Sequence, residues 1–255
     1  MLKIKEFVKA ESLEQAWELN QKRTSRILGG MLWMRMSDAS IQKAIDLSGL
    51  GLNTIEETKD SFVIGCMVTL RQLEVHEGLN AMCDGLVRKC TEDIVGVQFR
   101  NMATIGGSLF GRFGFSDVLT GFLVLDTYVE LYKGGIVPLA EFAKMKRDND
   151  ILVHVIVKKH TGQYAYLSHR NTKTDFPVLA VAASKIDGEV KAAIGARPER
   201  ALLYTVKDAS EASATGLAEE IPTGSNMRGS AEYRSHLAKV LLKRAFAELR
   251  AKEVD

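Results

Sequence analysis

Two glycine-containing segments hold the residues of this 255-residue chain whose types and spacing suit phosphate binding. The first is Gly29-Gly30, which directly follows a short apolar pair, Ile27-Leu28, that is typical of a strand end. Glycine at such a turn accepts positive φ and lets backbone amides approach a ligand closely. A run of such amides forms a nest for an anion, but two glycines after a strand are more often a plain turn. This pair alone leaves both interpretations open.

The second segment, residues 98–108, is polar and lies between two apolar stretches; it reads QFRNMATIGGS. Asn101 and Thr104 offer side-chain hydrogen bonds, and we expect Gly106-Gly107 to offer free backbone amides. Nine residues after Ser108, Asp117 stands at the start of an expected helix, where Ser116 or Asp117 can also serve simply as the N-cap.

The elements that would position these residues begin as strand, helix, strand. Ser12 and Gln15 have the spacing of a capping box before the helix, and another short strand is expected around residues 43–47. This βαβ order predicts parallel strands. Residues 61–68 read as a buried strand, and Thr69 begins a second capping box.

The rest of the chain predicts a helix over residues 116–126, a strand over 127–133, and a break at the charged stretch 144–150. Alternating segments after the break predict a small antiparallel sheet, and a final helix has an apolar stripe that includes Tyr233. The sheet segments are 151–157, 162–168 and 178–186, the helix is 230–253, and the predicted units are 1–55, 56–146 and 150–255.

Composition and charge exclude several classes of protein and of binding partner. Hydrophobic residues make up 46% and charged residues 26%, which is typical of a globular protein. Because Lys and Arg number 34 against 32 acidic residues, the charge gives no case for nucleic acid as a partner. The most apolar stretch, 118–131, is too short to span a bilayer, and the N-terminus does not read as a signal peptide. Three cysteines without a CxxC pair argue against disulfides and metal sites, so we expect a cytoplasmic protein.

The order of these motifs resembles the FAD-binding, or medium, subunit of the molybdenum hydroxylases, such as xanthine dehydrogenase and carbon monoxide dehydrogenase. The likeness is most specific at residues 97–109, VQFRNMATIGGSL, which is similar to the family signature R-N-x-A-T-I-G-G-N. It extends through residues 64–74, 122–131, 194–201 and 228–245. The resemblance implies an α+β fold in which a two-subdomain FAD-binding part is followed by a C-terminal domain of small antiparallel sheet plus helices.

The resemblance also implies a function as an FAD-containing oxidoreductase subunit. Noncovalently bound FAD would take electrons from 2Fe-2S clusters in a small partner subunit and pass them to NAD or another acceptor. A molybdopterin-binding large subunit would carry out the substrate chemistry, so the chain itself would supply neither catalytic nucleophile nor metal ligand.

The family's cofactor contacts transfer to this chain by position. The first loop would wrap the pyrophosphate, the second would lie around the phosphates and ribityl chain, Asp117 would hydrogen-bond the cofactor, and Tyr166 and Arg170 would approach the isoalloxazine. The first loop is Leu28, Gly29, Gly30, Met31, Leu32 and Trp33, continuing to Arg35, and the second is Thr104, Ile105, Gly106, Gly107 and Ser108.

Several positions depart from the family pattern. Where relatives read A-G-G-T-D-L, residues 28–33 keep the backbone amides but lose two polar side chains. Ser108 replaces an asparagine, Phe113-Gly114 replaces S-P, and Tyr166 replaces a lysine whose loss disfavours an anionic reduced flavin. These changes leave an alternative, an assembly subunit that keeps the fold without FAD. Nothing in the sequence favours a third reading, a free-standing flavin reductase.

Overall fold

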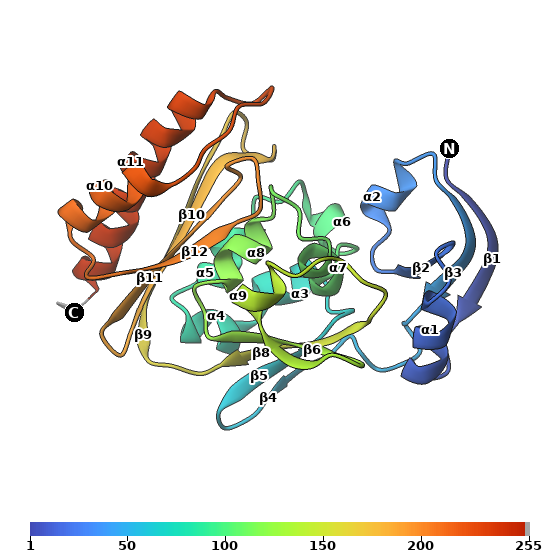
Figure 1. Ribbon diagram of the computed structural model, residues 1–255. Helices are drawn as coiled ribbons and strands as arrows, with labels where there is room; N and C mark the ends of the chain where they lie inside the picture. The colour runs from blue at the N-terminus through green and yellow to red at the C-terminus, as the bar shows by residue number, and fades with distance from the viewer. Residues whose placement is uncertain (253–255) are drawn as a thin grey trace.

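The computed structural model describes residues 1–252, in which three β-sheets follow one another along the chain (Figure 1). The first sheet has three parallel strands in the order β1-β3-β2, so the predicted βαβ arrangement is confirmed. The Ser12 Oγ accepts a hydrogen bond from the Gln15 amide at 3.1 Å and so begins the connecting helix. The elements are β1 (Lys3–Lys9), α1 (Leu13–Asn20), β2 (Ser25–Leu28), α2 (Leu32–Arg35) and β3 (Ser40–Asp46).

The second sheet has five strands in the order β4-β5-β8-β6-β7, and Figure 1 shows its helices gathered on one side. The predicted capping box at Thr69 is present and begins α3. The strands are β4 (Ile55–Glu57), β5 (Ser61–Gly65), β6 (Thr127–Leu131), β7 (Gly135–Pro138) and β8 (Leu152–Lys158). The helices are α3 (Leu70–Val75), α4 (Glu77–Met82), α5 (Leu86–Thr91), α6 (Val97–Arg100), α7 (Ile105–Phe110), α8 (Asp117–Phe122) and α9 (Leu139–Phe142).

The third sheet is antiparallel, in the order β12-β11-β10-β9, with two helices along its outer face (Figure 1). A separate apolar cluster fills the space between this sheet and the helices. The elements are β9 (Gly162–Arg170), β10 (Pro177–Ile186), β11 (Glu189–Gly195), β12 (Leu202–Val206), α10 (Glu211–Glu220) and α11 (Ala231–Ala251). None of the helices within residues 1–252 is both long and apolar enough to cross a membrane.

Two sequence predictions about the chain after residue 150 are wrong. Residues 151–157 do not join the third sheet, because β8 pairs with β5 and β6 in the middle of the second. The buried stripe of α11 excludes Tyr233 and instead includes Arg234, whose guanidinium satisfies carbonyls of the neighbouring loop at residues 224 and 229. The unit boundaries stay a prediction, although the place of β8 favours a second boundary after Lys158.

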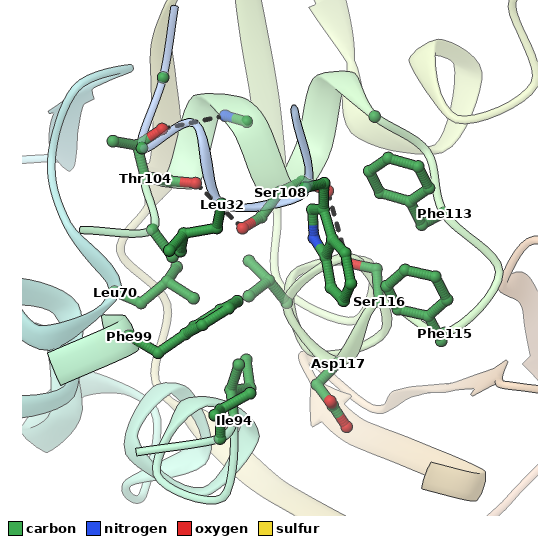
Figure 2. A pocket seen from close by; sticks show the side chains of 18 of the residues that line it. Leu32, Leu70, Ile94, Phe99, Thr104, Ser108, Phe113, Phe115, Ser116 and Asp117 are labelled. Carbon is green, nitrogen blue, oxygen red and sulfur yellow. Dashed lines mark hydrogen bonds between the residues drawn. The ribbon is translucent and has the colours of Figure 1, made fainter. Parts of the chain in front are cut away.

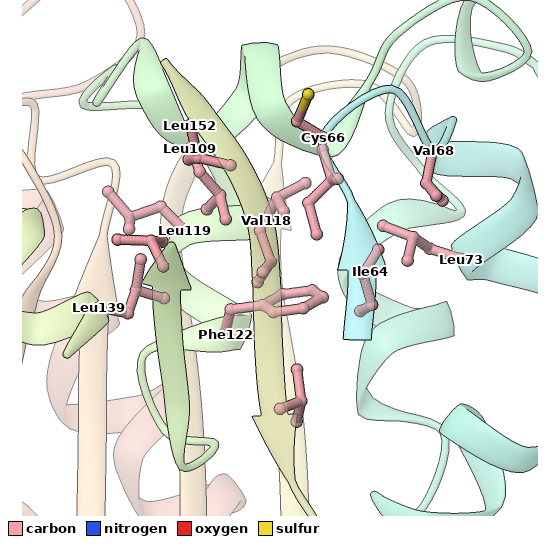
Figure 3. Packing of buried hydrophobic residues seen from close by; sticks show 14 of the residues in the cluster. Ile64, Cys66, Val68, Leu73, Leu109, Val118, Leu119, Phe122, Leu139 and Leu152 are labelled. Atoms are coloured by element: carbon pink, nitrogen blue, oxygen red, sulfur yellow. The ribbon is translucent and has the colours of Figure 1, made fainter. Parts of the chain in front are cut away.

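The largest apolar cluster draws residues from all three sheets and fixes α8 in the middle of the protein. Phe122 of α8 is fully buried and packs over the face of the second sheet in Figure 3, with its ring toward Ile64 of β5. Val118 and Leu119 on the same helix are also buried. Because α8 is held on several sides, its first residue, Asp117, has a fixed position facing the third sheet.

Candidate functional site

Two cavities meet beneath the two glycine loops. One, here called the aromatic cavity, has a volume of about 320 Å³ and reaches from Gly29 to Phe176. The other, here called the arginine-rimmed cavity, has about 450 Å³ and carries Arg23, Arg26 and Arg147. Their shared lining residues are Ile27, Gly29, Thr104, Gly107, Phe110 and Gly111. An elongated ligand lying in both cavities would therefore cross the glycine loops at its middle.

The first glycine loop, residues 29–34, presents a run of free backbone amides. None of these six amides makes a hydrogen bond within the described part of the chain. A Cβ on Gly30 would lie 2.0 Å from the Met102 carbonyl oxygen, so only glycine permits this approach. Met31 has φ +59°, a left-handed conformation that is strained for a side chain of its kind. Successive free amides beside a left-handed residue are the backbone arrangement from which anion nests are built.

The second glycine loop, residues 104–108, differs because its amides are already bonded. The Ile105 amide donates to the Val68 carbonyl at 2.9 Å, and the Gly106 amide to the Cys66 carbonyl at 3.0 Å. The Gly107 amide donates to Thr104 Oγ1 at 3.2 Å, which caps α7 (Figure 2). The expectation of free amides at residues 106 and 107 is therefore wrong.

Aromatic side chains from all three parts of the chain form one wall of the aromatic cavity. Trp33 stacks on Phe176 with ring centroids 5.4 Å apart, and Phe115 lies 4.4 Å from Phe176. Phe113 stacks on Phe115 at 5.2 Å, and Phe99 meets the edge of Trp33 at 6.2 Å. Figure 2 shows Phe99, Phe113 and Phe115 around the cavity. Such a wall suits a flat, apolar ligand group.

Asp117 lies at the far end of this cavity and is 5% exposed. Its Oδ1 accepts hydrogen bonds from the Tyr166 hydroxyl at 2.5 Å and from Arg170 Nη2 at 2.6 Å. Burial raises the pKa of Asp117 to about 6, and the Arg170 charge opposes that rise. Ser116 caps α8 by accepting from the Leu119 amide at 3.1 Å, so Asp117 is not the N-cap.

Comparison with protein families shows which family the chain is similar to. Residues 2–159 match the family described as the FAD binding domain in molybdopterin dehydrogenase. The chain belongs to this family. Residues 190–249 match the CO dehydrogenase flavoprotein C-terminal domain. No curated protein matches the sequence of the chain.

Solved structures of this type share the fold. The reconstituted CO dehydrogenase from Oligotropha carboxidovorans has a chain that is 24% identical, with a TM-score of 0.85, and the match covers 97% of this chain and 98% of that chain. For quinoline 2-oxidoreductase from Pseudomonas putida 86 the values are 19% identity, a TM-score of 0.83, and coverage of 96% of each chain. The expected α+β fold with its C-terminal sheet and helices is confirmed.

The residues of the site fit an FAD. The free amides of the first loop begin at Gly29, which lines both cavities, so a diphosphate between two ring systems could lie beside them. The aromatic cavity is wide and apolar enough to take a flat ring, and Asp117 and Arg170 supply polar groups at its end. The structure therefore offers a place for each part of a dinucleotide.

The sequence-predicted residues divide between the two cavities, with three exceptions. Ile105 is fully buried in the core, Tyr166 lies behind Asp117, and Arg35 is the last residue of α2, so none of the three lines a cavity. Leu28 and Gly106 line the arginine-rimmed cavity; Gly30, Met31, Leu32, Trp33, Ser108, Asp117 and Arg170 line the aromatic cavity; Gly29, Thr104 and Gly107 line both.

Sequence reasoning missed Phe99, Phe115, Phe176 and Arg147. The pair Phe113 and Phe115 on either side of a glycine was an available signal, because a loop that carries two large aromatic residues must bury them somewhere. Phe176 comes from a loop 61 residues after Phe115, and no local pattern connects it with Trp33.

Proposed function

We propose that this chain binds FAD noncovalently and serves as the electron-transfer subunit of a molybdopterin-dependent dehydrogenase or hydroxylase. The observation that carries the proposal is the run of six free amides, residues 29–34, which begins at Gly29, where the two cavities meet, and continues along the aromatic cavity. Family membership supports the same cofactor. When bound, FAD would accept electrons and deliver them as hydride to NAD or another acceptor.

The residues of the chain bind and orient the cofactor. The first-loop amides would hold the diphosphate, and the wall formed by Trp33, Phe115 and Phe176 would pack on the flavin and exclude water. The free Oδ2 of Asp117 is available to accept a hydrogen bond from the cofactor, because Tyr166 and Arg170 both bond Oδ1.

The proposed partners are a molybdopterin-binding large subunit and a small subunit that carries 2Fe-2S clusters, together forming a cytoplasmic hetero-oligomer. The matching family is that of molybdopterin dehydrogenases, and one similar solved structure is that of a Cu,Mo-CO dehydrogenase. These names support the proposal that the electrons reach this chain from other subunits.

An absorption spectrum of the purified full chain, before and after incubation with FAD, tests the cofactor. We expect the visible bands of an oxidised flavin, and heat denaturation should release intact FAD into the supernatant. A chain that stays colourless after incubation with FAD would contradict the proposal. Reduction of the flavin-loaded protein by NADH, which is the reverse of hydride transfer to NAD, and reoxidation of the reduced protein by artificial acceptors then address the electron acceptor.

A second function, that of an assembly subunit without flavin, is favoured by the aromatic wall. Trp33 contacts Phe115 and Phe176, and this packing already occupies part of the cavity. If this function is right, the chain should form a stable complex with its partner subunits without flavin. The double substitution Met31→Thr and Leu32→Asp, which restores the family's polar side chains, should then leave complex formation unchanged.

A further inference from the structure

We propose that Arg147 positions the diphosphate of the bound dinucleotide by supplying the charge that neither glycine loop provides. This inference rests on the proposed function. Neither the family signature nor the sequence pattern assigns a role to this residue, which lies in the segment between α9 and β8.

Arg147 lies where the two cavities join. It lines the arginine-rimmed cavity beside Gly107 and Gly111, both of which also line the aromatic cavity. Its Nη2 donates a hydrogen bond to the Gly111 carbonyl, directly after α7. Its guanidinium lies 5.2 Å from the centre of the Phe113 ring. These two contacts hold the cation at the C-terminal end of α7, the helix whose first turn carries the second glycine loop.

Three of the four other charged residues of this cavity are already bonded elsewhere, and the fourth, Arg23, precedes β2 and so belongs to the side of the first loop. Arg26 Nη1 donates to the carbonyls of residues 23 and 25 at 2.7 and 2.6 Å, so its guanidinium folds back on its own strand. The Asp150 carboxylate accepts from the amides of residues 134 and 151, each at 2.8 Å. Asp148 Oδ1 accepts from the Asp150 amide at 3.1 Å. Within residues 1–252, no carboxylate forms an ion pair with Arg147.

A cation is needed beside the second loop to bind phosphate, because the amides of that loop already donate hydrogen bonds within the protein. The amides of residues 105–108 all donate within the protein, so they cannot also bind phosphate oxygens. A diphosphate held only by the first loop would have uncompensated charge on its other side. Arginine suits this position, because its planar fork can donate two parallel hydrogen bonds to phosphate oxygens.

Binding measurements on the full chain test the role of Arg147. Three probes are titrated by calorimetry: FAD, ADP, which carries the diphosphate without the flavin, and riboflavin, which carries the flavin without phosphate. We expect Arg147→Ala to raise the Kd for FAD and ADP by about 10- to 100-fold, the range for a lost charge-assisted hydrogen bond. The Kd for riboflavin should change less than about twofold, a change too small to indicate a lost contact.

Lys146→Ala is the matched control, because it removes the same charge from the adjacent residue, which lines neither cavity. Arg147→Lys keeps the charge and should recover part of the affinity. It also keeps the test valid if the alanine variant folds poorly. Higher salt should weaken ADP binding to the wild type more than to Arg147→Ala.

The outcomes separate this inference from the proposed function. Equal ADP and FAD affinities in Arg147→Ala and Lys146→Ala overturn the role of Arg147 while FAD binding stands. A parallel loss of riboflavin affinity also overturns it, because the effect would then arise from the Phe113 side of the aromatic cavity. Absence of FAD binding to the wild type overturns both proposals.

Discussion

The glycine loop whose sequence is more similar to the family signature has fewer free backbone amides than the other loop. The second loop, residues 104–108, carries the motif most similar to the family signature, yet its amides are bonded inside the protein. The first loop departs from the family pattern in its side chains, yet its six amides are free. The signature motif at residues 104–108 therefore fixes the backbone on one side of the site. The amides that can bind an anion belong to residues 29–34, which lie outside that motif.

The largest expected effect comes from closing the approach between the first loop and Met102. Gly30→Ala would place a Cβ 2.0 Å from the Met102 carbonyl oxygen, so the loop must move. We expect a loss of about 2–4 kcal/mol in unfolding free energy and a loss of detectable FAD binding. Urea denaturation and flavin titration measure the two effects.

Gly216→Ala in α10 is the control for this substitution, because nothing lies within 4 Å of an added Cβ there. That change should be neutral or add up to about 1 kcal/mol, since alanine favours helix over glycine. If Gly30→Ala behaves like Gly216→Ala, the close approach of the first loop is not what holds the site in shape.

The dependence of the unfolding free energy on pH tests the part of the site that follows the second loop, where the carboxyl group of Asp117 is buried. Burial raises its pKa to about 6 from 3.8, so the native state keeps a proton that the unfolded chain releases between these values. Stability from this group is therefore present below pH 4 and is lost as pH rises to 6. The loss amounts to roughly 3 kcal/mol at 1.36 kcal/mol per pKa unit.

Asp117→Asn isolates this contribution, because asparagine does not titrate and can still accept from Arg170. The unfolding free energy of wild type minus variant should fall between pH 4 and 7, measured by urea denaturation at each pH. A difference that rises with pH would show that the Arg170 charge outweighs burial at this site.

The sequence predicts the local features of this fold better than the long-range ones. The capping box at Thr69 and the strand at residues 127–131 depend on neighbouring residues, and both are present. The placement of β8 could not be predicted locally, because its alternating pattern suits either antiparallel sheet and only pairing with β5 and β6 decides. Likewise, the glycines of the second loop indicate that its amides can approach a ligand. They do not indicate that the carbonyls of residues 66 and 68 already accept hydrogen bonds from the amides of residues 106 and 105.

A smaller effect is expected from the side chain that locks the second loop. Thr104 Oγ1 accepts from the Gly107 amide and caps α7, so Thr104→Ala should cost about 1 kcal/mol in unfolding free energy. Because the released amide at residue 107 would become free, FAD affinity should change little or improve. Thr104→Ser keeps the acceptor and is the control. A large loss of affinity with full stability would mean that Thr104 itself contacts the ligand.

The smallest expected effect concerns the strained residue of the first loop. Met31 holds φ +59°, which glycine adopts without steric penalty, so Met31→Gly relieves strain but also adds freedom to the unfolded chain. These effects oppose each other, and we expect a net change within about 1 kcal/mol. FAD affinity should stay within about threefold, since the amides that bind the anion belong to the backbone and not to the side chain. Met31→Ala retains the strain and removes the contacts beyond Cβ, so the difference between the two variants measures the relief of strain offset by the added freedom of the unfolded chain. If Met31→Gly abolished binding while Met31→Ala did not, the left-handed turn would be needed in rigid form to hold the amides, and the free amides alone would not explain the affinity of the first loop.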